Sequence, residues 1–342
     1  MKINLKIFLF LLSIGMLGAA SCVKRYLPEE RVQFSHSNAQ YISTTFTPTL
    51  GRPYLTDVSN FNFTGSTQPL TFKILNARTL SGDPAPEITT DVYPVKVWKQ
   101  QYTGLETSLK EIEDKRTVEP HHLFEVRPNS GQFLMWPEAS SKIFRSQPDS
   151  GYVFDVQVGN SGGSKYISGL RLKPLKERPY EPSNIDPVTG QATVPYVRNN
   201  LTFTNVVGEA GATFVDGVVF FRRKGDGNSL TFKFLDTAQH FINPNKFKLT
   251  QWTTLVHGFD MKLSDTAASY TVAYPVPLID QFPTKYTNPA GTLAHVVFAW
   301  SRIGFGQQFF NCSIAFDFKI YQPGDWEVIF WFRNDNPKFS DG

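Results

Sequence analysis

Three tryptophans lie at positions where strand alternation predicts a polar sheet face. Each shares its parity with polar residues: Trp252 with Lys248, Thr250 and Thr254, Trp331 with Glu327 and Arg333, and Trp98 with Lys96 and Gln100. An indole on a polar face is costly unless another surface covers it or a ligand stacks on it. Because sugar rings have apolar faces that stack on aromatic rings, we expect Trp252 and Trp331, and thirdly Trp98, to bind glycan. The alternative is that a loop, a helix or another domain covers each indole.

The segment VGNSGGSKY has the letters of a hydrolase nucleophile motif, with Gly159, Ser161 and Gly163 in G-x-S-x-G spacing. It also resembles the nucleophile segment of trypsin-like proteases. A nucleophile elbow requires a helix directly after the serine, whereas SKYISGLRLKP alternates as a strand. No Ala-Ala-His-Cys segment of the protease kind occurs upstream. We therefore expect a glycine-rich hairpin loop and no catalytic residue.

His121 and His122 are the only adjacent histidines, and on a strand they would point to opposite faces. A third and a fourth ligand are not evident, so we expect no metal site, and nothing indicates a cofactor. Asn334, Asp335 and Asn336 are predicted to form a polar turn, because no EF-hand spacing accompanies them. A pair of carboxylates for glycoside cleavage has no local motif, and an unrecognised glycan-active enzyme remains a remote alternative. We expect the protein not to be an enzyme.

Alternation with a period of two dominates the chain and predicts an all-β fold. We expect two β-sandwich domains in series, Ig-like or jelly-roll-like, with 30 phenylalanines filling their interiors. Trp300 and Cys312 share parity with apolar residues and are predicted to be buried. The GDGN stretch at 225–228 predicts a hairpin between its flanking strands. One amphipathic helix is expected at 104–116, with Thr103 and Glu106 as a capping box.

The first residues have the order of a secretory signal peptide, with Lys2 and Lys6 before an apolar run that is too short to span a bilayer. Ala19, Ala20 and Ser21 then precede Cys22, in an order that resembles a bacterial lipobox, so Cys22 is the expected lipidation site. A plain secreted protein is the alternative. We expect a signal peptide at 1–21, a tether at 22–33, domains at 34–177 and 198–342, and a proline-rich linker at 178–197.

The charge and the cysteine content of the chain limit which partners and which location we expect. The net charge is +4, and the basic segments FFRRKG and RLKPLKER are short, so no nucleic acid is expected as a partner. After lipidation of Cys22 only Cys312 remains, so no internal disulfide can form. The expected location is the outer membrane, through the lipid anchor, on its periplasmic face or on the cell surface.

Three segments, EPHHLFEVRPNSGQFLMWPEAS, YVFDVQVGNSGG and YEPS, resemble a family of uncharacterised outer-membrane lipoproteins of Bacteroidetes that contains a domain of unknown function. The resemblance covers nearly the whole chain after Cys22 and carries no functional residue with it. It implies association with polysaccharide-utilisation loci, whose surface glycan-binding proteins are β-sandwich modules on a lipid anchor. The resulting expectation is a glycan-binding accessory lipoprotein that binds a polysaccharide or oligosaccharide, with a transporter complex as a further partner. A structural or adhesin-like protein-interaction lipoprotein is the alternative.

Overall fold

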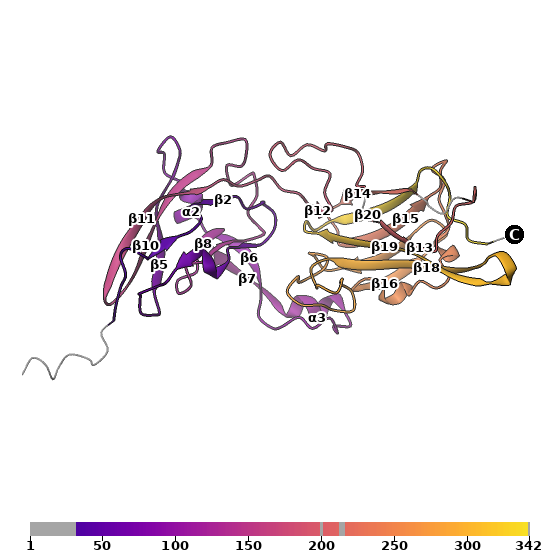
Figure 1. The fold of residues 1–342 in the computed structure, drawn as a ribbon, viewed down its shortest axis with the longest axis horizontal. Coiled ribbons are helices and arrows are strands. Elements are labelled where there is room, and N and C mark those ends of the chain that lie inside the picture. The colour runs from indigo at the N-terminus through magenta and orange to yellow at the C-terminus, as the bar shows by residue number, and fades with distance from the viewer. Residues whose placement is uncertain (1–31, 199–200, 212–215, 341–342) are drawn as a thin grey trace, which may run out of the picture.

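The computed structural model describes residues 32–198, 201–211 and 216–340, and Figure 1 shows them as two β-rich halves lying end to end. Strands dominate both halves and the helices are short, so the predicted all-β, sandwich-like fold is confirmed. The predicted signal peptide, Cys22 and most of the predicted tether lie outside the described residues. Among the described residues, no helix is long and apolar enough to cross a bilayer.

The N-terminal half contains four small sheets. Its four-stranded sheet has the order β2 (Thr45–Phe46), β11 (Gly163–Leu172), β10 (Tyr152–Asn160), β5 (Thr71–Thr79). The other sheets are β3 (Tyr54–Leu55), β9 (Phe133–Met135), β8 (Phe124–Val126); β1 (Gln40–Tyr41), β4 (Phe61–Asn62); and β6 (Tyr93–Trp98), β7 (Arg116–His121).

Phenylalanines fill the N-terminal core. The ring of Phe133 lies 4.6 Å from that of Phe46 and 5.3 Å from that of Phe154, so residues of β9, β2 and β10 meet at one point. Phe154 is on the inward parity of β10, and every second residue from Tyr152 to Val158 is buried. Alternation on β10 therefore places one face of the four-stranded sheet in the core.

The C-terminal half is a sandwich of two larger sheets. One sheet has the order β14 (Gly217–Gly225), β20 (Asp325–Phe332), β15 (Ser229–Leu235), β17 (Ala268–Val272), β16 (Gly258–Leu263). In the other, β19 (Phe309–Ile320) pairs with β18 (Ala294–Ile303), β12 (Tyr180–Glu181) and β13 (Leu201–Thr204). β12 lies inside the proline-rich tract, which packs along this half as an extended segment.

The two C-terminal sheets meet through aromatic rings. Phe298 of β18 lies 4.8 Å from Phe234 of β15 and 5.1 Å from Phe330 of β20 between ring centroids. Trp300 and Cys312, both only 1% exposed, belong to the same core, which confirms their predicted burial. The Sγ of Cys312 donates a hydrogen bond to the carbonyl of Asn205 at 3.2 Å.

The predicted hairpin at 225–228 is wrong. β14 and β15 do not pair with each other, because β20 lies between them, antiparallel to β14 and parallel to β15. The connection crosses the start of β20, where the Asp325 carboxylate accepts hydrogen bonds from the Gly227 amide at 3.1 Å and the Ser229 hydroxyl at 2.7 Å. The Ser229 hydroxyl is the main reason why the pKa of Asp325 is lowered. Alternation predicts strands but not which strand inserts between two others.

Helical segments are short connectors. The described residues form α2 (Pro86–Thr89), α3 (Leu109–Asp114), η1 (Val58–Asn60), η2 (Pro244–Lys246), η3 (Trp252–Thr254) and η4 (Phe305–Gln307). α3 is shorter than the helix expected at 104–116, since Ser108 caps it by accepting from the Glu111 amide at 3.2 Å. Thr103 and Glu106 do bond to each other, but they close a turn that precedes the helix.

Two glycines allow a matched test of backbone sterics. Gly151 and Gly169 both have positive φ, +74° and +79°, but a Cβ on Gly151 would lie 2.2 Å from the Leu172 carbonyl oxygen, whereas one on Gly169 would meet nothing within 4 Å. We expect Gly169→Ala to lower the free energy of unfolding by about 1–2 kcal/mol, the cost of a left-handed residue. Gly151→Ala should cost about 3 kcal/mol or more, since the clash adds to that cost. Urea denaturation of both variants measures the difference, and equal losses would contradict the argument.

Candidate functional site

Trp331 lies on the outer face of the five-stranded sheet of the C-terminal half. In β20 the residues Val328, Phe330 and Phe332 point into the core, so Trp331 points outward, as strand parity predicts. The Trp331 ring stacks on that of Phe220 in β14, with centroids 6.2 Å apart and an interplanar angle of 29°. Phe220 also has the outward parity of its strand, because Val219 and Phe221 pack against the core.

A third ring comes from the proline-rich tract. Val197 forms a two-way backbone bridge with Val219 of β14, with N–O distances of 2.8 and 3.1 Å. This bridge places the Tyr196 ring 5.9 Å from the Phe220 ring in an edge-to-face contact of 81°. Tyr196, Phe220 and Trp331 therefore form a continuous aromatic row across the edge of the sheet.

Arginines flank the row. The Arg333 guanidinium lies 5.3 Å from the Tyr196 ring and 5.6 Å from the Trp331 ring, while Arg222 lies over Phe220 at 5.6 Å and Arg198 over Tyr196 at 5.0 Å. The Tyr196 hydroxyl oxygen accepts from Arg198 at 2.6 Å and from Arg333 at 3.3 Å. These residues, Tyr196, Arg198, Phe220, Arg222, Trp331 and Arg333, are called the aromatic–arginine surface below.

The three rings of this surface are half-buried rather than covered. On the same face Val218 pairs with Trp331 and Ile329 with Phe220, and both are fully or almost fully buried, at 0% and 4% exposed, although they lie on the outward parity of their strands. The Trp331 Nε1 donor is shielded from solvent and has no hydrogen-bond acceptor among the described residues. An unsatisfied buried donor typically costs about 1–3 kcal/mol, so packing alone does not explain this position.

Trp252 does not lie on a strand, contrary to the prediction from the sequence. It begins the 3-10 helix η3, where strand parity does not apply, and its half-buried ring packs against the C-terminal core 5.8 Å from Phe298. Its backbone carbonyl accepts from the Tyr270 hydroxyl at 2.6 Å. The surface of Trp252 that remains for a ligand is thus the side turned away from the core.

Trp98 ends β6, in the hairpin that reaches from the N-terminal half to the C-terminal half. The indole is 36% exposed, and the Arg116 guanidinium lies over it at 4.4 Å. Arg116 in turn donates to the Tyr274 carbonyl of the C-terminal half at 2.9 Å. Trp98, Trp252 and Trp331 therefore belong to three separate settings, and the structure does not join them into one platform.

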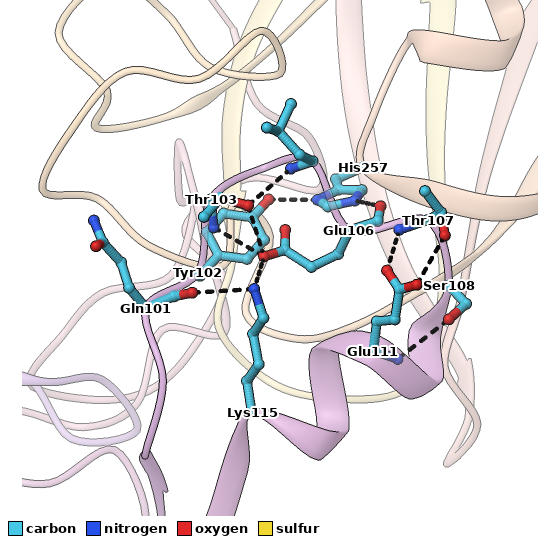
Figure 2. A network of polar contacts seen from close by, with 10 residues as sticks. Gln101, Tyr102, Thr103, Glu106, Thr107, Ser108, Glu111, Lys115 and His257 are labelled. Atoms are coloured by element: carbon cyan, nitrogen blue, oxygen red, sulfur yellow. Dashed lines mark hydrogen bonds and ion pairs between the residues drawn. The ribbon is translucent and has the colours of Figure 1, made fainter.

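The segment between β6 and β7 carries α3 and docks on the C-terminal half (Figure 1). Tyr102 and Ile112 of this segment form a small buried cluster with Ala273 and Leu278. Figure 2 shows the polar network beside it, in which the Tyr102 hydroxyl contacts His257 Nδ1 and the His257 Nε2 lies 2.8 Å from the Glu106 carbonyl oxygen. One neutral tautomer satisfies both contacts, with Nε2 donating to Glu106 and Nδ1 accepting from Tyr102.

Glu106 is the charged centre of this network. Its side chain is 2% exposed and accepts from the Thr103 amide and hydroxyl, both at 2.9 Å, and from Lys115 (Figure 2). Burial alone would raise the pKa of Glu106, but the hydrogen bonds from Lys115 and Thr103 outweigh it and lower the pKa to about 2. Glu106 is therefore ionised at neutral pH and acts as a fixed anion that holds the segment in place.

The chemistry of the network is structural. Burial raises the pKa of Tyr102 and lowers that of His257, so both side chains are neutral near pH 7. The adjoining cavity, lined by His257, Tyr286 and Thr284 among others, measures about 20 Å³, room for about one water molecule. The network therefore ties the two halves together.

Ser161 and the adjacent histidines His121 and His122 lie in separate parts of the N-terminal half. Ser161 lies in the turn between β10 and β11, where Asn160 pairs with Gly163, so the predicted glycine-rich hairpin is confirmed. The His121 ring packs on Trp136 with centroids 4.8 Å apart, and His122 Nδ1 contacts the Asp91 carbonyl at 2.9 Å. Within the described ranges, no group of three or more His, Cys, Asp or Glu residues is arranged to hold a metal ion.

Comparison with protein families matches residues 61–341 to a family described as a domain of unknown function, DUF5007. The chain belongs to DUF5007. This confirms the expected membership in an uncharacterised domain family, and the DUF5007 match includes residues of both hydrophobic cores. Comparisons with curated proteins and with solved structures find no match.

The sequence of this DUF5007 chain predicts only part of the aromatic–arginine surface. Strand parity places Trp331 and Arg333 on one outward face, but it does not place Phe220, Tyr196, Arg198 or Arg222 beside them. The available signal was VVFFRR, where Phe220 has the opposite parity to Val219 and Phe221, as Trp331 has to Phe330. No sequence signal places Tyr196 there, since a backbone bridge between distant segments brings it to β14.

Proposed function

We propose that this protein is a non-enzymatic cell-envelope lipoprotein that binds glycan through the aromatic–arginine surface, as an accessory of a polysaccharide-utilisation system. The observation that carries the proposal is the half-buried stack of Trp331 on Phe220 on the outer face of a sheet. Stacked aromatic rings with polar neighbours are suited to the apolar face of a sugar ring.

The form of the surface favours a polymer over a small molecule. The aromatic row crosses neighbouring strands on the outer face of a sheet, whereas small-molecule ligands are usually enclosed in concave pockets. A glycan chain can lie along such a row and contact several rings in succession. The side chains of the aromatic–arginine surface carry indole, phenyl, phenol and guanidinium groups. Arginine keeps its proton at neutral pH and cannot act as a general base, which favours binding over acid–base chemistry.

The envelope setting of the proposal rests on the N-terminal segment. The signal-peptide order of residues 1–21 and the lipobox-like position of Cys22 support export and lipid anchoring to the outer membrane. The Bacteroidetes origin and the link to polysaccharide utilisation rest on the resemblance of three segments to such lipoproteins. A transporter complex would then be the partner that receives the glycan.

The first test measures retardation of the purified protein in native gels that contain single polysaccharides. We expect at least one polysaccharide to retard the protein, and Trp331→Ala to weaken that binding about tenfold or more, as for a central aromatic residue worth about 2 kcal/mol. Phe220→Leu, which removes the stacked ring but keeps an apolar side chain, should also weaken binding of that polysaccharide. Circular dichroism establishes that each variant is folded.

The matched control is Phe309→Ala, which removes a ring that is 73% exposed on a different sheet and should leave binding unchanged. Trp252→Ala and Trp98→Ala, tested in parallel, show whether the other two predicted tryptophans contribute. Retardation by no polysaccharide, or retardation that survives both Trp331→Ala and Phe220→Leu, would contradict glycan binding at this surface.

One observation favours the protein-interaction alternative. The end of the β18–β19 hairpin exposes Ile303 at 47% and Phe309 at 73%, beside an open groove of about 520 Å³ that Leu201, Phe203 and Phe310 help to line. Exposed apolar groups of this kind are typical of contacts with another protein. If no glycan binds, a pull-down from outer membranes with Phe309→Ala as the comparison tests this second function.

A further inference from the structure

Three arginines on the aromatic–arginine surface have no acidic partner. Among the described residues, Arg198, Arg222 and Arg333 form no ion pair with any Asp or Glu. Their neighbours on the same sheet are paired: Arg223 bonds to Asp226 at 2.5 Å, and Lys233 bonds to Glu327 at 2.5 Å. Lys224 and Lys262 of the same sheet also form no ion pair among the described residues, so what distinguishes the three arginines is that they lie against aromatic rings.

Glu327 lies near Arg222, but its carboxylate bonds to a different cation. Glu327 lies directly opposite Arg222 in the β14–β20 ladder, yet its carboxylate bonds to Lys233 of β15 instead. Arg222 is exposed and turns its guanidinium toward the Phe220 ring at 5.6 Å. A carboxylate that could neutralise Arg222 is thus within the same cross-strand pair but is held by another cation.

Arg333 is held in a fixed direction. It is half-buried, donates to the Tyr196 hydroxyl at 3.3 Å, and lies against two aromatic rings at 5.3 and 5.6 Å. Arg198 donates to the same hydroxyl from its own side at 2.6 Å. A guanidinium fixed in this way loses little conformational entropy when it binds a ligand.

We infer that the aromatic–arginine surface recognises an acidic glycan, one whose sugar rings carry carboxylate groups, with the rings of Trp331 and Phe220 stacking on sugar and the arginines Arg198, Arg222 and Arg333 bonding to carboxylates. This inference rests on the proposed glycan binding and names the substrate class of the same surface. A guanidinium has only donors, arranged as a planar fork that matches the two oxygens of a carboxylate. Neutral sugars require acceptors as well as donors, and these six side chains offer few acceptors.

A single-stranded nucleic acid is the other polyanion that could stack and pair at such a surface. The composition of the chain argues against a nucleic acid, because the net charge is only +4 and the basic segments FFRRKG and RLKPLKER are short. The experiment therefore includes an oligonucleotide as a competing probe.

The test measures binding of the purified protein by calorimetry to polygalacturonate, to the same polymer with its carboxylates methyl-esterified, and to neutral starch and xylan. We expect polygalacturonate to bind about tenfold or more tightly than its esterified form, and Arg198→Gln/Arg222→Gln to remove about tenfold of that affinity, as loss of charge-assisted hydrogen bonds predicts. Arg223→Gln is the matched control. It removes one positive charge at the position next to Arg222, where Asp226 already pairs with the guanidinium, and should change affinity less than twofold.

The outcomes separate the two proposals. If a neutral polymer binds as well as polygalacturonate, and Trp331→Ala weakens it while the arginine substitutions do not, glycan binding stands and the acidic-glycan inference is overturned. Binding of no polysaccharide overturns both proposals. Binding of a single-stranded oligonucleotide more tightly than polygalacturonate, with the same dependence on Arg198 and Arg222, overturns the inference in favour of a nucleic acid.

Discussion

Phe298→Ala is expected to lower the free energy of unfolding by about 3–5 kcal/mol, the usual cost of deleting a buried phenyl ring. Phe298 is fully buried at the centre of the C-terminal core. Its ring lies 4.8, 5.1 and 5.6 Å from those of Phe234, Phe330 and Phe232, which belong to the opposite sheet. The cavity left by alanine would remove these contacts between the two sheets, and partial collapse would not restore them.

Urea denaturation followed by tryptophan fluorescence measures this effect, since Trp300 lies in the same core. Phe309→Ala is the matched control: it deletes the same side chain at a position 73% exposed, and should change the free energy of unfolding by no more than about 0.5 kcal/mol. Similar losses for both variants would mean that the two C-terminal sheets do not pack through Phe298.

Glu106→Ala is expected to lower the free energy of unfolding by about 3 kcal/mol, because it removes one partner of a mostly buried ion pair. The Glu106 side chain is 2% exposed and that of Lys115 is 21% exposed, so the ammonium group would be left with little solvent to replace the carboxylate. The Thr103 amide and hydroxyl would lose their acceptor as well. The segment carrying α3 should then detach more easily from the C-terminal half, which hydrogen exchange at residues 102–112 would detect.

The same contact predicts an acid dependence. The folded-state pKa of Glu106, about 2, lies below the value of about 4.3 for an unfolded glutamate. The stabilisation that Glu106 contributes is therefore complete above about pH 4.3. It is lost as the pH falls towards 2, because the Glu106 carboxylate of the folded protein then becomes protonated as well. Glu106→Gln should remove this component, while Glu111→Gln, a change at an exposed carboxylate of the same segment, should keep it. Equal acid sensitivity of the wild type and Glu106→Gln would contradict the assignment.

Local patterns in the sequence were sufficient to predict the strands and to predict which face of each strand is buried. The inward parity of β10, β15 and β20 follows from alternation, because side chains on a strand point to opposite faces with a period of two. The same rule predicted the burial of Trp300 and Cys312 and the outward direction of Trp331. The turn at 161–162 followed from its glycines, since such a turn depends only on neighbouring residues.

Contacts between distant segments required the tertiary structure. The insertion of β20 between β14 and β15 joins residues about a hundred positions apart, and no local pattern specifies that choice. For Trp252, a 3-10 turn replaced the expected strand, so its parity carried no information about its exposure. The helix at α3 is shorter than its amphipathic pattern, because Ser108 rather than Thr103 caps it.

The aromatic–arginine surface depends both on local strand parity and on contacts between distant segments. The all-β fold and the outward direction of Trp331 follow from the residue pattern, because both depend on the period of the side chains along one strand. Arg333 shares that direction, but Phe220, Tyr196, Arg198 and Arg222 reach Trp331 only through tertiary contacts, namely the β14–β20 pairing and the Val197–Val219 bridge. The physical reason is that a binding surface is built from side chains of several strands, and their order in a sheet is set by packing of the whole half rather than by any one segment.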